Sequence, residues 1–149
     1  MLLEVEESKG RDVEMAEPVS FRFERLSVWQ SARGLGGHVY AATRRFPREE
    51  TFGLTSQIRR AAISIAANIA EGSGRNSDPD FAHFLEIAYG SSMELVALTV
   101  VAADSGFLDE EARDDLVTRT SAVTAQISAL HRSLAVKRTK TPFERKSPL

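Results

Sequence analysis

FGLTSQIRRAAISIAANIAEGSGR, residues 52 to 75, decides the fold of this 149-residue chain. The stretch reads as one helix of about five turns that is rich in alanine and isoleucine. At about 100° per residue, its polar positions fall in one strip roughly 80° wide. That strip contains Gln57, Ala61, Ser64, Asn68, Glu71 and Arg75. Apolar residues spread over much of the remaining circumference.

An apolar arc this wide predicts that the helix is buried on more than one side. A surface helix carries one apolar stripe of somewhat more than 100°, whereas a helix that is apolar nearly all round is buried. The core of one small bundle covers too little surface to bury this helix fully. We therefore expect the helix to pack inside its own subunit and also against another subunit.

The preceding segment, Phe23 to Phe46, also shows helical periodicity and ends at Pro47. Its glycines, Gly34, Gly36 and Gly37, each cost about 1 kcal/mol relative to alanine in a helix interior. The expected compensation is the close approach of a neighbouring helix, and a local kink is the alternative.

Two further helices follow the deciding stretch, which is expected to stop at Gly72 and Gly74. Ser77 or Asp78 is the predicted N-cap of the third helix, which ends at Gly106. Asp109 is the predicted N-cap of the fourth, which runs to Val136. No segment alternates like a strand, and the connections are short. The sequence therefore predicts an all-α protein folded as an up-down-up-down four-helix bundle.

The two ends of the chain carry opposite charge, although the formal net charge is only −2. Residues 1–17 hold six acidic and two basic residues, and residues 132–149 hold six basic residues and one acidic residue. We expect an acidic, disordered leader over 1–20, the bundle over 21–136 and a basic, flexible tail over 137–149. The chain has no cysteine, which excludes disulfides and thiol catalysis and suits a cytoplasmic location.

The sequence carries no motif that is typical of an enzyme. His38, His83 and His131 lie on three different predicted helices and lack the paired Glu-x-x-His motif of di-iron bundles, so we expect no metal and no cofactor. Residues 72–75, GSGR, follow a helix and not a strand, so glycines that end a helix explain them better than a phosphate-binding loop does. No motif nominates a serine nucleophile. We expect a protein that is not an enzyme.

Two groups of polar residues are the candidate interaction sites. If the second helix is deeply buried, Asn68 and Glu71 need donors or cations, because a buried unsatisfied group costs about 1–3 kcal/mol. Together with Gln57 and Ser64 they are interpreted as a strip that holds helices or subunits in register, with ligand contact as the alternative. The second group is a possible phosphate-binding surface of arginines: Arg44, Arg45, Arg48, Arg59, Arg60 and Arg75.

These residues, taken together, resemble the four-helix-bundle proteins encoded in 23S rRNA intervening sequences. The similar segments include LSVWQSA at 26–32, FP at 46–47, QIRRAAISI at 57–65, NIAEG at 68–72 and FLEIAYGS at 84–91. The resemblance covers roughly Phe23 to Leu134. It implies a bundle that assembles as a ring-shaped homopentamer without established enzymatic activity. A relative of similar fold, the accessory variability determinant of diversity-generating retroelements, binds nucleic acid and a reverse transcriptase through a strongly basic surface.

Two hypotheses of function follow. The first is a non-enzymatic oligomeric scaffold or adaptor whose partners are copies of itself and RNA or a ribonucleoprotein. The second is a protein-protein interaction module that binds no nucleic acid. The mildly acidic composition of this chain departs from that of the basic relative and leaves both hypotheses open.

Overall fold

The computed structural model describes Pro18 and residues 20–139, and every regular element in these residues is helical. Four α-helices account for most of them: α1 (Ser27–Thr43), α2 (Leu54–Ser73), α3 (Asp78–Asp104) and α4 (Glu110–Thr139). A short 3-10 helix precedes each of the first two α-helices. η1 (Arg22–Arg25) lies before α1, and η2 (Arg48–Glu50) lies before α2. The predicted all-α class is confirmed for this part of the chain.

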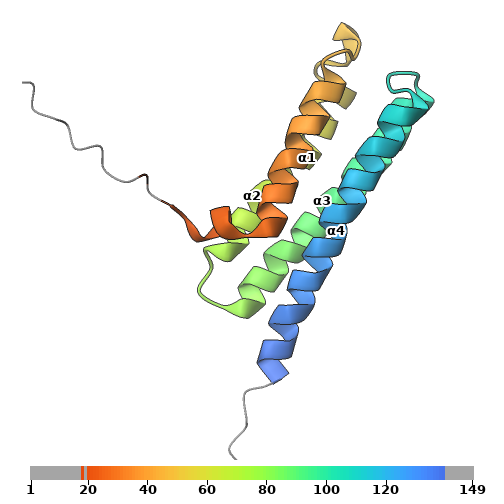
Figure 1. Ribbon diagram of the computed structural model, residues 1–149. Helices are drawn as coiled ribbons and strands as arrows, with labels where there is room; N and C mark the ends of the chain where they lie inside the picture. The colour runs from red at the N-terminus through yellow and green to blue at the C-terminus, as the bar shows by residue number, and fades with distance from the viewer. Residues whose placement is uncertain (1–17, 19, 140–149) are drawn as a thin grey trace, which may run out of the picture.

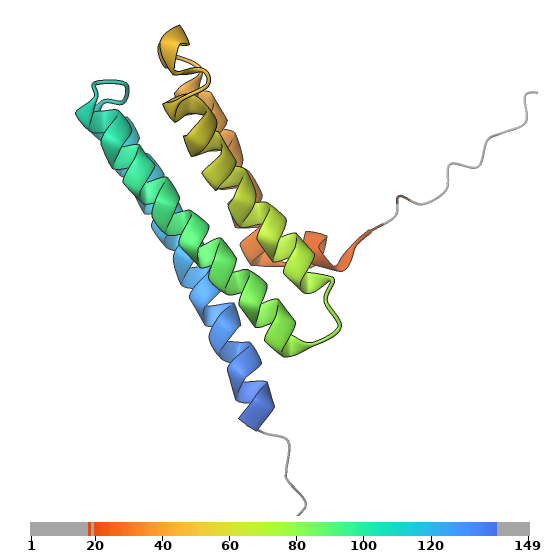
Figure 2. The ribbon, with the colours of Figure 1, turned by 180° about the vertical axis from the view of Figure 1, so that it is seen from behind.

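The four helices run alternately up and down, so each is antiparallel to the next (Figure 1). The connections from α1 to α2 and from α3 to α4 lie at one end of the bundle, and the α2–α3 connection lies at the other. α2 packs most extensively against α3, and the two lie side by side when seen from behind (Figure 2). Within the described residues α1 makes no close backbone approach to α3, so these two helices are diagonal in the bundle.

The core is a single cluster of buried side chains, to which the inward face of every α-helix contributes. Its largest fully buried side chains are aliphatic and come from α2, α3 and α4: Ile58, Ile65, Ile69, Leu85, Leu95, Leu116 and Ile127. Burying such a side chain stabilises the fold by about 1.5–3 kcal/mol relative to leaving it exposed. The buried hydroxyls of Thr99 and Thr120 donate to carbonyl oxygens one turn back, so they enter the core without losing a hydrogen bond.

The predicted helix signals around α3 and α4 are confirmed by backbone geometry. The Ser77 hydroxyl accepts from the Asp80 amide at 3.2 Å, and the Asp109 carboxylate accepts from the Ala112 amide at 2.7 Å. Gly106 has φ +80 and follows the last turn of α3, where the Phe107 amide donates to the Ala102 carbonyl. This is the left-handed ending that favours glycine.

The predicted start of the first helix is wrong. Leu26 is extended, with ψ 121, and separates η1 from α1, so Phe23 lies on a distinct turn. The ring of Phe23 packs edge-on against Trp29 at 4.8 Å between centroids. Arg22 reaches the far end of α2 and donates to the Ser73 carbonyl at 3.3 Å. Long-range packing of this turn outweighs the local helical periodicity.

The ends of the second helix also differ from the prediction. α2 begins at Leu54, whose amide donates to the Glu50 carboxylate at 3.0 Å, and Phe52 before it is 97% exposed. Gly72 is a buried residue inside the helix and not its stop. A Cβ there would lie 2.6 Å from the Phe84 Cβ, so only glycine permits the contact with α3. Gly74 is the C-cap, as expected.

The last helix extends beyond the predicted limit of the bundle. α4 continues to Thr139, three residues beyond the expected boundary at Val136. The acidic leader, apart from Pro18 and Ser20, and the basic tail from residue 140 lie outside the described residues.

By length and composition, α3 is apolar enough to cross a membrane, a test that core helices of soluble proteins also pass. Only 33% of its most apolar window is buried inside this chain. Glu86 and Glu94 lie in its middle, where a charged side chain in lipid costs about 2.5–3.5 kcal/mol. The apolar surface of α3 therefore needs an explanation other than the core of its own subunit.

Candidate interaction surfaces

An open apolar groove of about 480 Å³ runs between α1 and α2 on the outside of the bundle. We call it the α1–α2 groove. Its α1 side holds Trp29, Arg33, Gly36, Gly37 and Tyr40, its α2 side holds Ile63, Ala66, Ala67 and Ala70, and Phe23 closes one end. Ile63 is 49% exposed, so the second apolar face of α2 is not covered within the subunit. The expected packing inside the subunit is confirmed, and the expected packing against another subunit stays a prediction.

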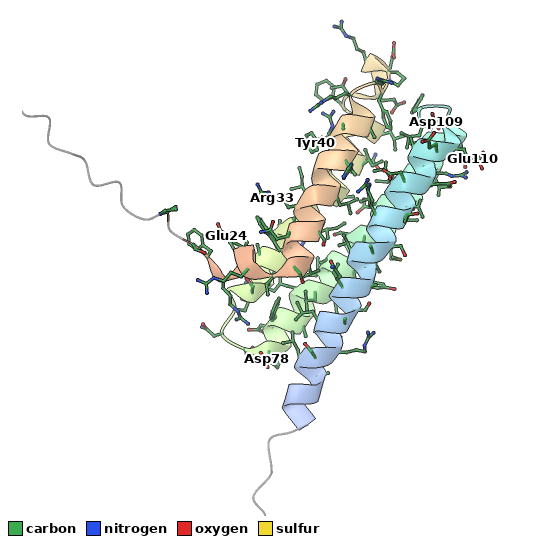
Figure 3. All side chains as sticks on the ribbon, in the orientation of Figure 1. Glu24, Arg33, Tyr40, Asp78, Asp109 and Glu110 are labelled. Carbon is green, nitrogen blue, oxygen red and sulfur yellow. The ribbon has the colours of Figure 1, made fainter. Side chains whose placement is uncertain are left out.

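Two arginines stack on the two large aromatic rings of the groove. The Arg33 guanidinium lies 5.6 Å from the centre of the Trp29 ring. The Arg59 guanidinium lies 4.6 Å from the Tyr40 ring, and its Nε donates to the Thr43 hydroxyl at 2.8 Å. Figure 3 shows Arg33 and Tyr40 projecting from α1 on the side away from α4. The groove therefore has an apolar floor and a positively charged rim.

The glycines of α1 do not serve the purpose expected from the sequence. A Cβ built on Gly34, Gly36 or Gly37 would meet no packed atom within 4 Å, so no helix of this subunit approaches them closely. α1 is also continuous through all three positions, so the glycines do not interrupt the helix. Gly36 and Gly37 open into the α1–α2 groove, whereas Gly34 lies on the α4 side of the helix beside Arg119.

The opposite flank of α2, facing α3, is polar and partly buried. The Ser64 and Ser91 hydroxyls lie 2.8 Å apart across the two helices. The Asn68 amide nitrogen donates to the Ser64 carbonyl at 2.8 Å and to its hydroxyl at 3.0 Å. A second small bridge joins α3 to α4, where the Thr124 hydroxyl donates to that of Ser92 at 3.1 Å. Short polar side chains thus tie α2 to α3 and α3 to α4 at defined heights.

The expected burial of the polar strip is wrong for half of its members. Glu71 is exposed and pairs at 3.1 Å with Arg75, the i, i+4 partner suggested by the sequence. Gln57 is exposed as well and lines a polar groove of about 440 Å³ with Arg60 and Glu94. Asn68 is satisfied by Ser64 and not by an arginine. A wide apolar arc did not imply deep burial, because α1 covers only part of it.

The six arginines predicted as one surface are divided by the structure. Arg44, Arg45, Arg48 and Arg60 are exposed near the end of the bundle that carries η2. Arg59 is close by, but its guanidinium is engaged by Tyr40 and Thr43. Arg75 follows α2 at the other end, sixteen residues or roughly 24 Å along the helix from Arg59. Four arginines therefore form a candidate phosphate-binding patch, which we call the basic end.

No group of three histidine, aspartate or glutamate side chains in the described residues is arranged to hold a metal ion. His131 lies 3.1 Å from the Glu86 carboxylate across α3 and α4, and His83 lies 3.9 Å from it. These contacts sit at an open pocket of about 330 Å³ on the surface between the two helices. The arrangement links two helices and offers no nucleophile or base in an enclosed site.

The surfaces missed by sequence reasoning are the aromatic wall of the groove and the outer face of α3. The wall had a signal, because Trp29, Arg33, Gly36 or Gly37, and Tyr40 recur at helical spacing on one side of α1.

Comparison with known proteins agrees with this architecture. The crystal structure of a protein of unknown function from the S23 ribosomal protein family of Bacteroides thetaiotaomicron superposes with a TM-score of 0.66 at 18% identity, covering 70% of this chain and 98% of that one. At that identity the likeness shows the fold alone. No curated protein matches the chain. Residues 24–129 match the 23S rRNA-intervening sequence protein family. This match spans most of the bundle, and the chain belongs to that family.

Proposed function

We propose that this protein is a subunit of a non-enzymatic cytoplasmic scaffold or adaptor that assembles as a ring-shaped homopentamer. The observation that carries the proposal is the open α1–α2 groove, lined by Trp29, Tyr40, Ile63 and alanines. Contiguous apolar surface of this kind marks interaction sites, because monomeric soluble proteins rarely leave it in water. The subunit number of five follows from the resemblance to the family and not from the groove.

Light scattering of the purified full-length protein after size exclusion tests this proposal. We expect a mass five times that of the chain at micromolar concentration, stable on dilution. A monomer would overturn the assembly, and an assembly of another size would overturn the pentamer.

RNA or a ribonucleoprotein is the partner that we propose for this scaffold, on the observation of the basic end. Arg44, Arg45, Arg48 and Arg60 are each exposed toward the η2 end of the bundle, and a ring would repeat them once per subunit. Repeated contacts to phosphates give affinity that falls steeply as salt rises. The α3 helix, by contrast, carries five acidic residues and no lysine or arginine, so binding would be confined to the α1–α2 side of that end.

The matched pair of variants compares the basic end with Arg75. Replacing Arg44, Arg45 and Arg48 by glutamate should weaken binding of a labelled ribosomal RNA fragment roughly tenfold or more at low salt. Arg75→Glu, at the far end, should leave it nearly unchanged. Arg59 is a poor choice of variant because it packs on Tyr40.

Unchanged RNA mobility with wild-type protein at low salt would end the nucleic-acid proposal. Co-purification of a protein partner without nucleic acid would then favour the second hypothesis, a protein-protein interaction module.

A further inference from the structure

A second apolar surface lies on the outer face of α3. We call it the α3 ridge, and it consists of Ile87, Gly90, Met93, Ala97, Val100 and Val101. The large members are between 40% and 50% exposed, and Gly90 has no packed atom within 4 Å of a Cβ built on it. At 100° per residue these positions cover one continuous side of the helix, away from Leu85 and Leu95. The ridge accounts for the apolar surface of α3 that its own core does not use.

We propose that the α3 ridge of one copy lies in the α1–α2 groove of the next copy. The inference rests on the proposed oligomeric function and names the surfaces that would join its subunits. The two surfaces are similar in length: Trp29 to Tyr40 spans about 16 Å of α1, and Ile87 to Val101 spans about 21 Å of α3.

The glycines supply an independent argument. Gly36 and Gly37 cost about 1 kcal/mol each in a helix interior, and nothing inside the subunit compensates for them. Gly90, on the α3 ridge, is likewise a helix-interior glycine with no packed atom of its own subunit within 4 Å of a Cβ. Helix backbones approach closely only where side chains are absent or small, so an incoming α3 ridge would fill the space that these residues leave open.

Charge complementarity selects a second copy over another occupant. From Ser27 to Ser73 the chain carries six basic and three acidic residues, whereas α3 carries five acidic residues and no lysine or arginine. Arg33 and Arg59 rim the groove. Glu94 and Asp104 fall on the same side of α3 as Gly90, Ala97 and Val101. Opposite charges around an apolar centre steer and align such an interface.

The contact would be heterologous, because the groove belongs to α1 and α2 while α3 is diagonal to α1. Each subunit would then use two different faces, which generates a closed ring when the rotation between neighbours closes. A two-fold dimer would instead pair one face with itself.

The glycines provide variants that leave the subunit intact. Gly37→Leu places a side chain in the groove from a Cβ position that has no packed atom within 4 Å, and it should reduce the assembly to monomers of unchanged helicity. Gly34→Leu is the matched control, because Gly34 is equally open but lies on the α4 side of the same helix. It should assemble like the wild type. Val101→Lys on the ridge should also give monomers.

Mixing the two monomeric variants distinguishes the heterologous contact from any other. Gly37→Leu keeps its ridge and Val101→Lys keeps its groove, so an equimolar mixture should form a one-to-one dimer and no ring. Native mass spectrometry identifies the dimer by its composition.

The outcomes separate the inference from the proposed function. A wild-type monomer overturns both, and so does a monomer that sediments with phosphatidylglycerol vesicles, since lipid would then cover the ridge. A wild-type ring that persists in Gly37→Leu and Val101→Lys leaves the scaffold standing and overturns the groove-ridge contact. A mixture that stays monomeric overturns the heterologous pairing.

Discussion

The two flanks of α2 differ in a way that reverses the usual rule. Toward α3, where the helix is packed, the Ser64 hydroxyl is hydrogen-bonded to the Ser91 hydroxyl and also accepts from the Asn68 amide. Toward the α1–α2 groove, where it is open, the helix presents Ile63 and alanines. Polar groups are normally left in water and apolar groups covered.

The difference is informative because each flank is selected by a different contact. The packed polar flank fixes the height of two helices, since a slip of one turn would leave hydroxyls without their protein partners. An open apolar flank lowers solubility unless something covers it. The two flanks therefore separate what the subunit does for itself from what it offers to a partner.

Ile65 and Ile63 give the largest expected contrast on α2. Ile65 is fully buried, so Ile65→Ala should lower the free energy of unfolding by about 2–5 kcal/mol through the cavity it leaves. Ile63→Ala, 49% exposed in the groove, should cost less than about 1 kcal/mol at low protein concentration. Urea titrations at two concentrations measure both losses.

The dependence on concentration is the control for this pair. The loss in Ile63→Ala should grow as assembly becomes complete, because the groove is then covered, while the loss in Ile65→Ala should change little. Equal losses for the two variants at low concentration would show that the groove is already filled within the subunit.

Gly72 and Gly37 give the second contrast. The space beside Gly72 is occupied by side chains of α3, whereas no atom packs beside Gly37. Gly72→Ala would bring Cβ within 2.6 Å of the Phe84 Cβ and should cost about 1–3 kcal/mol. Gly37→Ala meets no packed atom, so it should stabilise the isolated subunit by up to about 1 kcal/mol. Thermal unfolding of both variants decides the sign, and destabilisation by Gly37→Ala would contradict the open groove.

Some helix ends depend only on residues that are close in sequence. Ser77, Gly106 and Asp109 mark helix ends by hydrogen bonds within a few residues, and these ends were predicted correctly. The break at Leu26 before α1 was not predicted, because it depends on the packing of Phe23 against Trp29. The structural role of Gly72 depends on α3 in the same way, since Phe84 lies twelve residues further along the chain.

The candidate surfaces were predictable in composition but not in position. The apolar excess of α2 was visible, and it correctly indicated a second face. Which side that face occupies depends on where α1 crosses α2, which periodicity does not specify. The arginines illustrate the same limit: Arg75 was grouped with Arg59 by residue type, whereas the length of α2 places them at opposite ends of the bundle.

Alanine variants of Ser64 and Ser91 test whether the polar flank of α2 stabilises its packing against α3. Each single change to alanine should cost about 0.5–1.5 kcal/mol, and the double variant should cost less than the sum of the two. Ser64→Ala also removes the bond from Asn68 to the Ser64 hydroxyl, but this loss occurs in the single and the double variant alike and cancels in the cycle. Strictly additive losses would show that the two hydroxyls do not depend on each other.

The exposed pair of Glu71 and Arg75 should contribute least. The two side chains are 56% and 47% exposed, and water screens their attraction. Glu71→Gln should therefore change the free energy of unfolding by less than about 0.5 kcal/mol, and 1 M salt should remove most of that difference. Urea titration at low and high salt measures it. A loss above 1 kcal/mol that persists in salt would mean that Glu71 is buried in the assembled protein, which would extend the subunit contact from the groove to the end of α2.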